Sequence, residues 1–155
     1  MKRRPFPLLT VIVMLAGTVL TMGCQKDIYS EPPQYGTLFF SADSIVWQGV
    51  ITPVHSFAPG DTVYVGVTIE YDGAYITRAE QQWALRGGGE DPLRTEKKTV
   101  VGPVGKEPVW KFTAPLEPGE YSVTFKEKYS YSAQRPNGTI FGESATLNSK
   151  FRVRE

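Results

Sequence analysis

The stretch Thr62-Val63-Tyr64-Val65-Gly66-Val67-Thr68-Ile69-Glu70 alternates apolar residues with polar or small ones. Successive side chains of a β-strand point to opposite faces, so this alternation gathers Val63, Val65, Val67 and Ile69 on one face. The residues just before it, Ala58-Pro59-Gly60-Asp61, are typical of a turn, because proline presets φ and glycine accepts a positive φ. The stretch therefore predicts a strand with one buried face.

Similar short runs recur along the chain, separated by Gly, Pro, Asp and Asn, and no long run has the apolar spacing of a helix. About seven strands at roughly ten-residue spacing predict an all-β antiparallel sandwich. The expected inward residues include Trp83, Leu85, Trp110, Phe112, Tyr121, Val123, Phe125, Leu147, Phe151 and Val153. The further predicted strands span residues 38–40, 44–51, 81–85, 95–101, 109–113, 121–125 and 147–153.

Three stretches resemble the immunoglobulin-like domains of bacterial surface proteins. Residues 58–63 look like the start of the second strand of such domains, and Trp83 looks like the tryptophan of their third strand. Residues 118–123, Pro-Gly-Glu-Tyr-Ser-Val, look like the start of the sixth strand with its tyrosine corner. The resemblance implies an immunoglobulin-like sandwich over residues 37–155, in which the Tyr121 hydroxyl bonds to the chain just upstream. It implies a fold and no particular activity.

The N-terminus has the pattern of a secretory signal: Lys2-Arg3-Arg4, an apolar run over residues 6–22, and then Gly23-Cys24. This pattern resembles the signal of bacterial lipoproteins, and Cys24 is the only cysteine of the chain. The resemblance implies cleavage before Cys24 and acylation of its thiol, with palmitate among the acyl chains. An ordinary signal peptide is the alternative. We expect a lipoprotein signal peptide over residues 1–23 and a lipidated flexible stem over residues 24–36.

The residues after the cysteine, Gln25-Lys26-Asp27, resemble the export signal of Bacteroidetes-type surface lipoproteins. This resemblance implies an outer-membrane protein, lipid-anchored and displayed on the cell surface. The alternative is an outer-membrane protein that faces the periplasm. In either case the lipid on Cys24 is the expected contact with the membrane.

The charge balance argues against a nucleic-acid partner. The chain has 17 Lys and Arg against 16 Asp and Glu, and loss of Lys2, Arg3 and Arg4 with the signal leaves an excess of two acidic residues. Nucleic-acid binding needs concentrated Lys and Arg. Only Lys97-Lys98 and the Arg152/Arg154 pair stand together in sequence, so we expect no basic patch and no nucleic-acid partner.

The sequence selects no catalytic or metal site. His55 is the only histidine, and a zinc site needs three or four ligands. No pattern selects a catalytic pair from the carboxylates, which are expected on solvated faces and loops. We expect neither a cofactor nor enzymatic activity. The carboxylates considered for such a pair are Glu70, Asp72, Glu90, Asp91, Glu127 and Glu143.

Aromatic residues near a predicted hairpin are the candidate ligand contacts. Tyr129 and Tyr131 continue the register of Tyr121 and Phe125 beyond the expected core, and Arg135 lies in the turn over residues 135–138. Exposed tyrosines there could stack on a sugar or anchor a protein partner. The alternative interpretation is that both tyrosines complete the core at the end of the sandwich.

Together these features predict a non-catalytic, lipid-anchored protein of the cell envelope. It would act as a binding or accessory module with a glycan or protein partner. The alternatives are a structural or assembly partner of a membrane complex, and a lipid-anchored protease inhibitor that presents a loop. The sequence does not identify the ligand.

Overall fold

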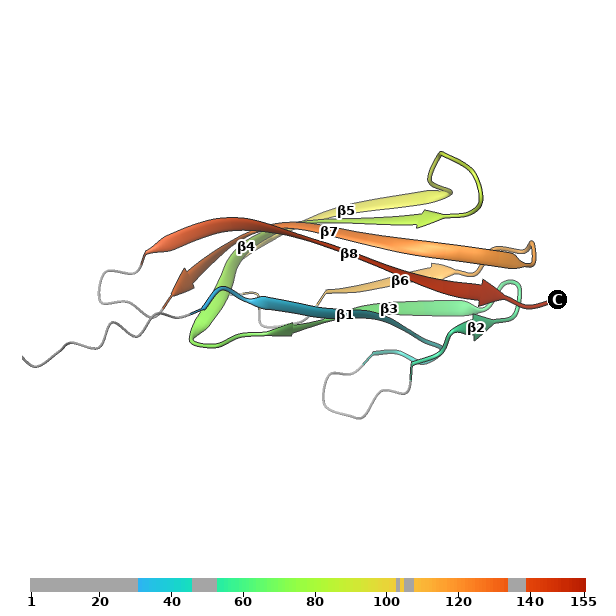
Figure 1. The fold of residues 1–155 in the computed structure, drawn as a ribbon, viewed down its shortest axis with the longest axis horizontal. Coiled ribbons are helices and arrows are strands. Elements are labelled where there is room, and N and C mark those ends of the chain that lie inside the picture. The colour runs from blue at the N-terminus through green and yellow to red at the C-terminus, as the bar shows by residue number, and fades with distance from the viewer. Residues whose placement is uncertain (1–30, 46–52, 103, 105–107, 134–138) are drawn as a thin grey trace, which may run out of the picture.

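Two β-sheets pack face to face in the computed structural model of the chain, which describes residues 31–45, 53–102, 104, 108–133 and 139–155 (Figure 1). No helix in these residues is long and apolar enough to cross a membrane. The smaller sheet has the order β1 (Gln34–Ser41), β3 (Thr62–Glu70), β6 (Val109–Thr113). The larger has the order β2 (Ser56–Phe57), β8 (Ile140–Val153), β7 (Gly119–Ala133), β4 (Ala74–Arg86), β5 (Arg94–Val101).

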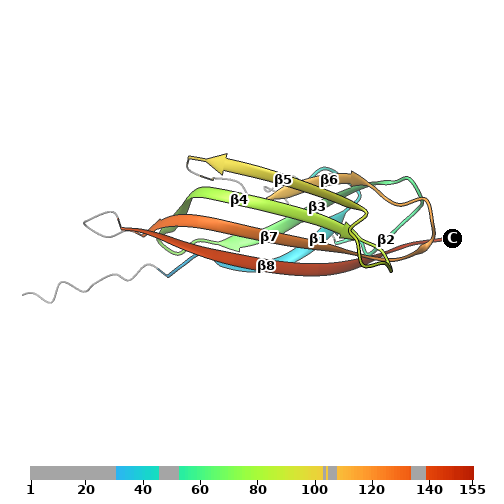
Figure 2. The same ribbon diagram turned by 90° about the horizontal axis from the view of Figure 1, so that it is seen from above.

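The predicted all-β sandwich is confirmed. All neighbouring strands are antiparallel except β2 and β8, which run parallel. The chain changes sheet after β1, β2, β3, β5 and β6, and in the larger sheet β7 lies between β4 and β8 (Figure 2). Two mainly antiparallel sheets packed face to face in this way form a β-sandwich.

Several strands are longer than predicted. β4 begins at Ala74 and β8 at Ile140, rather than at residues 81 and 147, and β1 begins at Gln34, inside the range expected to form the stem. Ser44 and Ile45 are not in a strand, contrary to the prediction of a strand over residues 44–51, whose remainder lies outside the described residues.

The alternation of β3 builds one wall of the core. Val63, Val65 and Val67 are fully buried, and Ile69 is nearly so, as predicted. The turn before β3 has Gly60 at a φ of 81°, which explains the need for glycine there. Burial of this apolar row against the larger sheet is a main source of stability.

Aromatic rings fill the space between the sheets. Phe151 of β8 packs against rings from both sheets, with centroid distances of 5.1 Å to Phe40, 5.8 Å to Phe112 and 5.7 Å to Tyr121. Trp83 of β4 stacks on Trp110 of β6 at 5.9 Å. The predicted inward orientation of Trp83, Trp110, Phe112, Tyr121 and Phe151 is confirmed.

The tyrosine corner is also confirmed. The Tyr121 hydroxyl donates a hydrogen bond of 2.8 Å to the carbonyl oxygen of Glu117. This bond fixes the chain between β6 and β7 where it enters the larger sheet.

Candidate functional site

The two tyrosines proposed as ligand contacts lie inside the sandwich. Tyr129 and Tyr131 are 5% and 6% exposed, and their rings pack near Tyr35 (5.0 Å) and Phe141 (5.3 Å), respectively. The expectation that the rings are partly exposed is wrong, because β1 and the start of β8 cover them. They complete the core at this end, which was the alternative interpretation.

The other predicted site residues are not described by the structure. Cys24, Gln25-Lys26-Asp27 and Arg135 all lie outside the described residues. His55 is described and is exposed just before β2. Within the described ranges, no group of three or more His, Cys, Asp and Glu side chains lies close enough to hold a metal ion.

Cations gather on the outer face of the larger sheet. The pairing registers and the buried alternate residues show which side chains of β4, β5, β7 and β8 point away from the core. Basic residues outnumber acidic ones strongly on this face, so the expectation of no basic patch is wrong. We call this surface the basic face: Arg78, Arg86, Lys97, Lys126, Lys128, Lys150 and Arg152, with Glu80 and Glu120 as its acidic members.

The basic face was not predicted from the sequence, because its members are far apart in the chain. Lys97 of β5 and Lys126 of β7 both belong to one cross-strand row, in which each is paired with Gln82 of β4. The signal present in the sequence was the alternation of Lys126 and Lys128 with the inward Phe125 and Tyr129. Only the strand register adds the cations of the neighbouring strands.

Ion pairs neutralise part of this charge. Arg78 contacts Glu80 at 3.1 Å, and Lys150 contacts Glu120 at 2.7 Å. The hydrogen bond from Lys150 lowers the pKa of Glu120, and the same bond raises the pKa of Lys150. Lys97, Lys126 and Lys128 form no ion pair within the described part of the chain.

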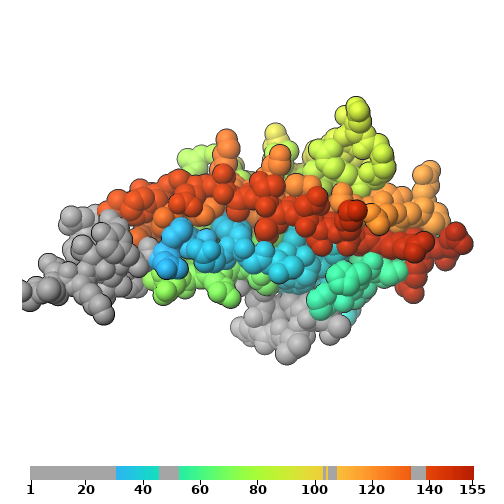
Figure 3. Space-filling view, viewed as in Figure 1, coloured from blue at the N-terminus to red at the C-terminus, as the bar shows by residue number. Residues whose placement is uncertain are grey.

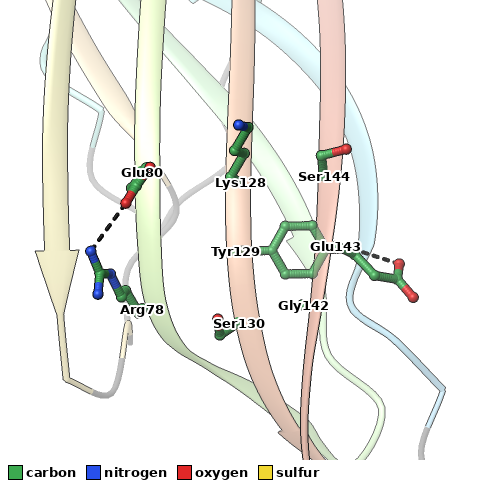
Figure 4. A pocket seen from close by; sticks show the side chains of 8 residues that line it. All are labelled: Arg78, Glu80, Lys128, Tyr129, Ser130, Gly142, Glu143 and Ser144. Atoms are coloured by element: carbon green, nitrogen blue, oxygen red, sulfur yellow. Dashed lines mark hydrogen bonds and ion pairs between the residues drawn. The ribbon is translucent and has the colours of Figure 1, made fainter.

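Two shallow hollows mark the centre of the basic face. One, of about 600 Å³, lies over β4, β7 and β8 and is lined by Arg78, Lys128, Ser130 and Gly142 among others (Figure 4). The second, of about 500 Å³, extends to β5. We call the two together the trough, because both are lined by Glu80, Lys128 and Ser144.

The trough lies on an uneven surface. In Figure 3, orange side chains of β7 project above the red surface of β8, whereas Gly142 contributes no side chain to β8. On the outer face, the second hollow is also lined by polar or charged side chains: Gln82, Lys97, Thr99, Lys126 and Thr146. The arrangement offers cations and hydroxyl groups together, which suits an anionic, hydrogen-bonding ligand.

A buried carboxylate lies beneath the trough, on the inner face of β7. Glu127 is 1% exposed, and neither of its carboxyl oxygens has a partner in hydrogen-bonding geometry among the described residues. Burial raises the pKa of Glu127 to about 7, although the nearby Gln81 and Tyr35 side chains act to lower it. Glu127 is among the residues that line the second hollow, but its side chain belongs to the inward row of β7.

No protein-family model matches the chain, and no curated protein is detectably similar to it in sequence.

Proposed function

We propose that this protein is a non-catalytic, lipid-anchored binding module of the cell envelope, with the basic face as its binding surface. The observation that carries the proposal is the set of three lysines, Lys97, Lys126 and Lys128, that surround the trough without an ion pair among the described residues. Unpaired cations on a shared surface attract an anionic partner and increase its association rate.

The lipid anchor comes from the resemblance at the N-terminus. Cys24 carries the acyl chains in this proposal, and Gln25-Lys26-Asp27 directs the protein to the cell surface. Two acyl chains are enough for stable membrane attachment. The first described strand, β1, starts at one end of the sandwich, and the C-terminus lies at the opposite end (Figure 1). The basic face therefore runs along one side of the sandwich, between its two ends, where a partner can reach it.

A binding role is favoured over catalysis by the distribution of reactive groups. His55 is exposed before β2, far from the trough along the sheet, and the buried Glu127 has no access to a substrate. A role in assembly through strand addition is less favoured. β5 forms one edge of the larger sheet, and its sequence Arg-Thr-Glu-Lys-Lys-Thr-Val-Val carries charges of the kind that protect edge strands.

Protease treatment of intact cells tests the display of the protein. The chain carries a tag after Glu155, and the wild type is compared with Lys26→Ala/Asp27→Ala and with Cys24→Ala. We expect loss of the tag from the wild type and protection of the Lys26→Ala/Asp27→Ala variant, because the export signal is removed. Cys24→Ala should leave the membrane fraction. A wild type that stays protected, or a Cys24→Ala chain that stays membrane-bound, would contradict the proposed location or anchor.

A further inference from the structure

The lysines of the trough are spread both along a strand and across the strands. Lys126 and Lys128 lie two residues apart on β7, which separates their Cα atoms by about 7 Å. Lys97 lies across Gln82 in the same row as Lys126, two strand spacings or about 10 Å away. A ligand that meets all three lysines therefore needs several anionic groups spaced along its length.

The lining also has a chemical signature beyond its charge. Beside the lysines it holds two carboxylates, Glu80, which pairs with Arg78, and Glu143, which accepts a hydrogen bond from Tyr129. Hydroxyl and amide groups come from Gln82, Thr99, Ser130, Ser144 and Thr146. These groups donate and accept hydrogen bonds, as the hydroxyl groups of a sugar polymer do.

Large exposed apolar side chains are missing from the lining of the trough. The exposed large apolar residues of the described chain belong to other places: Tyr75, Leu93, Val101, Val109, Leu116 and Ile140. Binding to a bilayer surface uses buried apolar side chains, and the centre of a protein interface is enriched in aromatic anchors. The trough fits neither kind of partner as well as it fits a polar polyanion.

We propose that the trough binds an acidic polysaccharide, a polymer whose sugar units carry carboxylate groups. The lysines contact successive carboxylates, and the serine, threonine and glutamine side chains bind the sugar hydroxyls. The polymer lies across β5, β4, β7 and β8. This proposal deepens the proposed function and rests on the basic face being the binding surface.

Polygalacturonate and its fully methyl-esterified form test the proposal, because they share a backbone and differ in charge. The full, acylated chain in a non-ionic detergent is titrated with each polymer by calorimetry. We expect binding to polygalacturonate that weakens as sodium chloride is added, and no binding to the ester. Lys126→Gln/Lys128→Gln should weaken the binding by about tenfold or more.

A matched variant controls for net charge. Lys111→Gln/Arg154→Gln removes two exposed cations that do not line the trough: Lys111 lies over Tyr64 on the smaller sheet, and Arg154 follows the end of β8. It should bind as the wild type does. Equal weakening in both double variants, or equal binding of the two polymers, would overturn the proposal.

Binding of other anionic partners is measured in the same experiment. Polyglutamate and double-stranded DNA replace the polysaccharide at equal charge, and phosphatidylglycerol vesicles are tested with the Cys24→Ala chain. Stronger binding to any of these than to polygalacturonate would overturn the assignment. Because these measurements use purified protein, a failure here leaves the protease result on intact cells unchanged, and the two proposals fail separately.

Discussion

At the scale of single residues, Glu127 is the least expected member of the interior. It occupies an inward position of β7 between Phe125 and Tyr129, where the alternation of the strand predicts an apolar side chain. Its carboxyl group faces Tyr35 from β1 and Gln81 from β4, and Glu127 in turn contributes to raising the pKa of the Tyr35 hydroxyl, although burial of Tyr35 is the larger cause. A buried charge without good hydrogen bonds costs stability, so Glu127 is best accommodated in its protonated form.

The first prediction concerns the pH dependence of stability at Glu127. The pKa is raised from 4.5 in a solvated carboxyl to about 7 in the folded protein, so the folded state holds the proton more tightly than the unfolded chain. Stability from this group is therefore fully present below about pH 4.5 and is lost as the pH rises through 7, by at most about 3 kcal/mol. Glu127→Gln should remove this loss, because glutamine stays neutral.

Urea unfolding of the wild type and Glu127→Gln at pH 5 and pH 8 measures the effect. The free energy of unfolding of Glu127→Gln minus that of the wild type should be larger at pH 8 than at pH 5, because only the wild type loses stability as Glu127 ionises. Exposed carboxylates contribute equally to both proteins and cancel in this difference. A difference that stays constant with pH would show that Glu127 is not titrating in this window.

At the scale of elements, the ring of Phe39 on β1 covers its cross-strand partner Gly66 on β3. A Cβ atom on Gly66 of β3 would lie 2.5 Å from the ring of Phe39 on β1, which shows that the ring occupies the space of a side chain. Gly66→Ala should destabilise the protein by about 1–3 kcal/mol, since the ring has to move. Gly88→Ala in the loop after β4 is the matched control, because no atom of the described residues lies within 4 Å of its added Cβ. Thermal unfolding of both variants tests this, and an equal change in the two would contradict the packing described for Gly66.

The strands that were predicted well are those with a regular alternation over a well-covered core. β3 and the first part of β7 are examples, because every second residue is a buried Val, Ile, Tyr or Phe. The start of β8 was missed, since Gly142, Glu143 and Ser144 are exposed and show no apolar alternation. The start of β4 was missed for a different reason: its pairing with β7 shifts between Ile76 and Arg78, so that the apolar pattern changes phase.

The candidate site could not be predicted from the sequence at this level. Its cations come from β4, β5, β7 and β8, and they share a face only after the pairing register is known. The tyrosines that sequence analysis favoured were correctly placed in register, yet their exposure depended on how far β1 and β8 extend. A local pattern assigns a side chain to a face, whereas long-range pairing decides what covers that face.

At the scale of the whole molecule, the two sheets differ in their outer surfaces. The larger sheet carries the basic face, while residues 24–155 as a whole have a small excess of acidic residues, so the charge is unevenly distributed. The smaller sheet exposes Thr62, Thr68, Lys111 and Thr113 on its outer side. We propose that the basic face, and not the outer side of the smaller sheet, contacts a partner in the cell envelope.

Site-specific photo-crosslinking on intact cells tests that claim most directly. A photoreactive residue replaces Thr146, which lines the trough, or Thr113, an exposed threonine on the outer side of β6. The account predicts a crosslinked envelope component from position 146 that is lost in the Lys126→Gln/Lys128→Gln background, and none from position 113. Crosslinks from position 113 alone, or crosslinks from position 146 that persist without the two lysines, would contradict the assignment of the basic face as the binding surface.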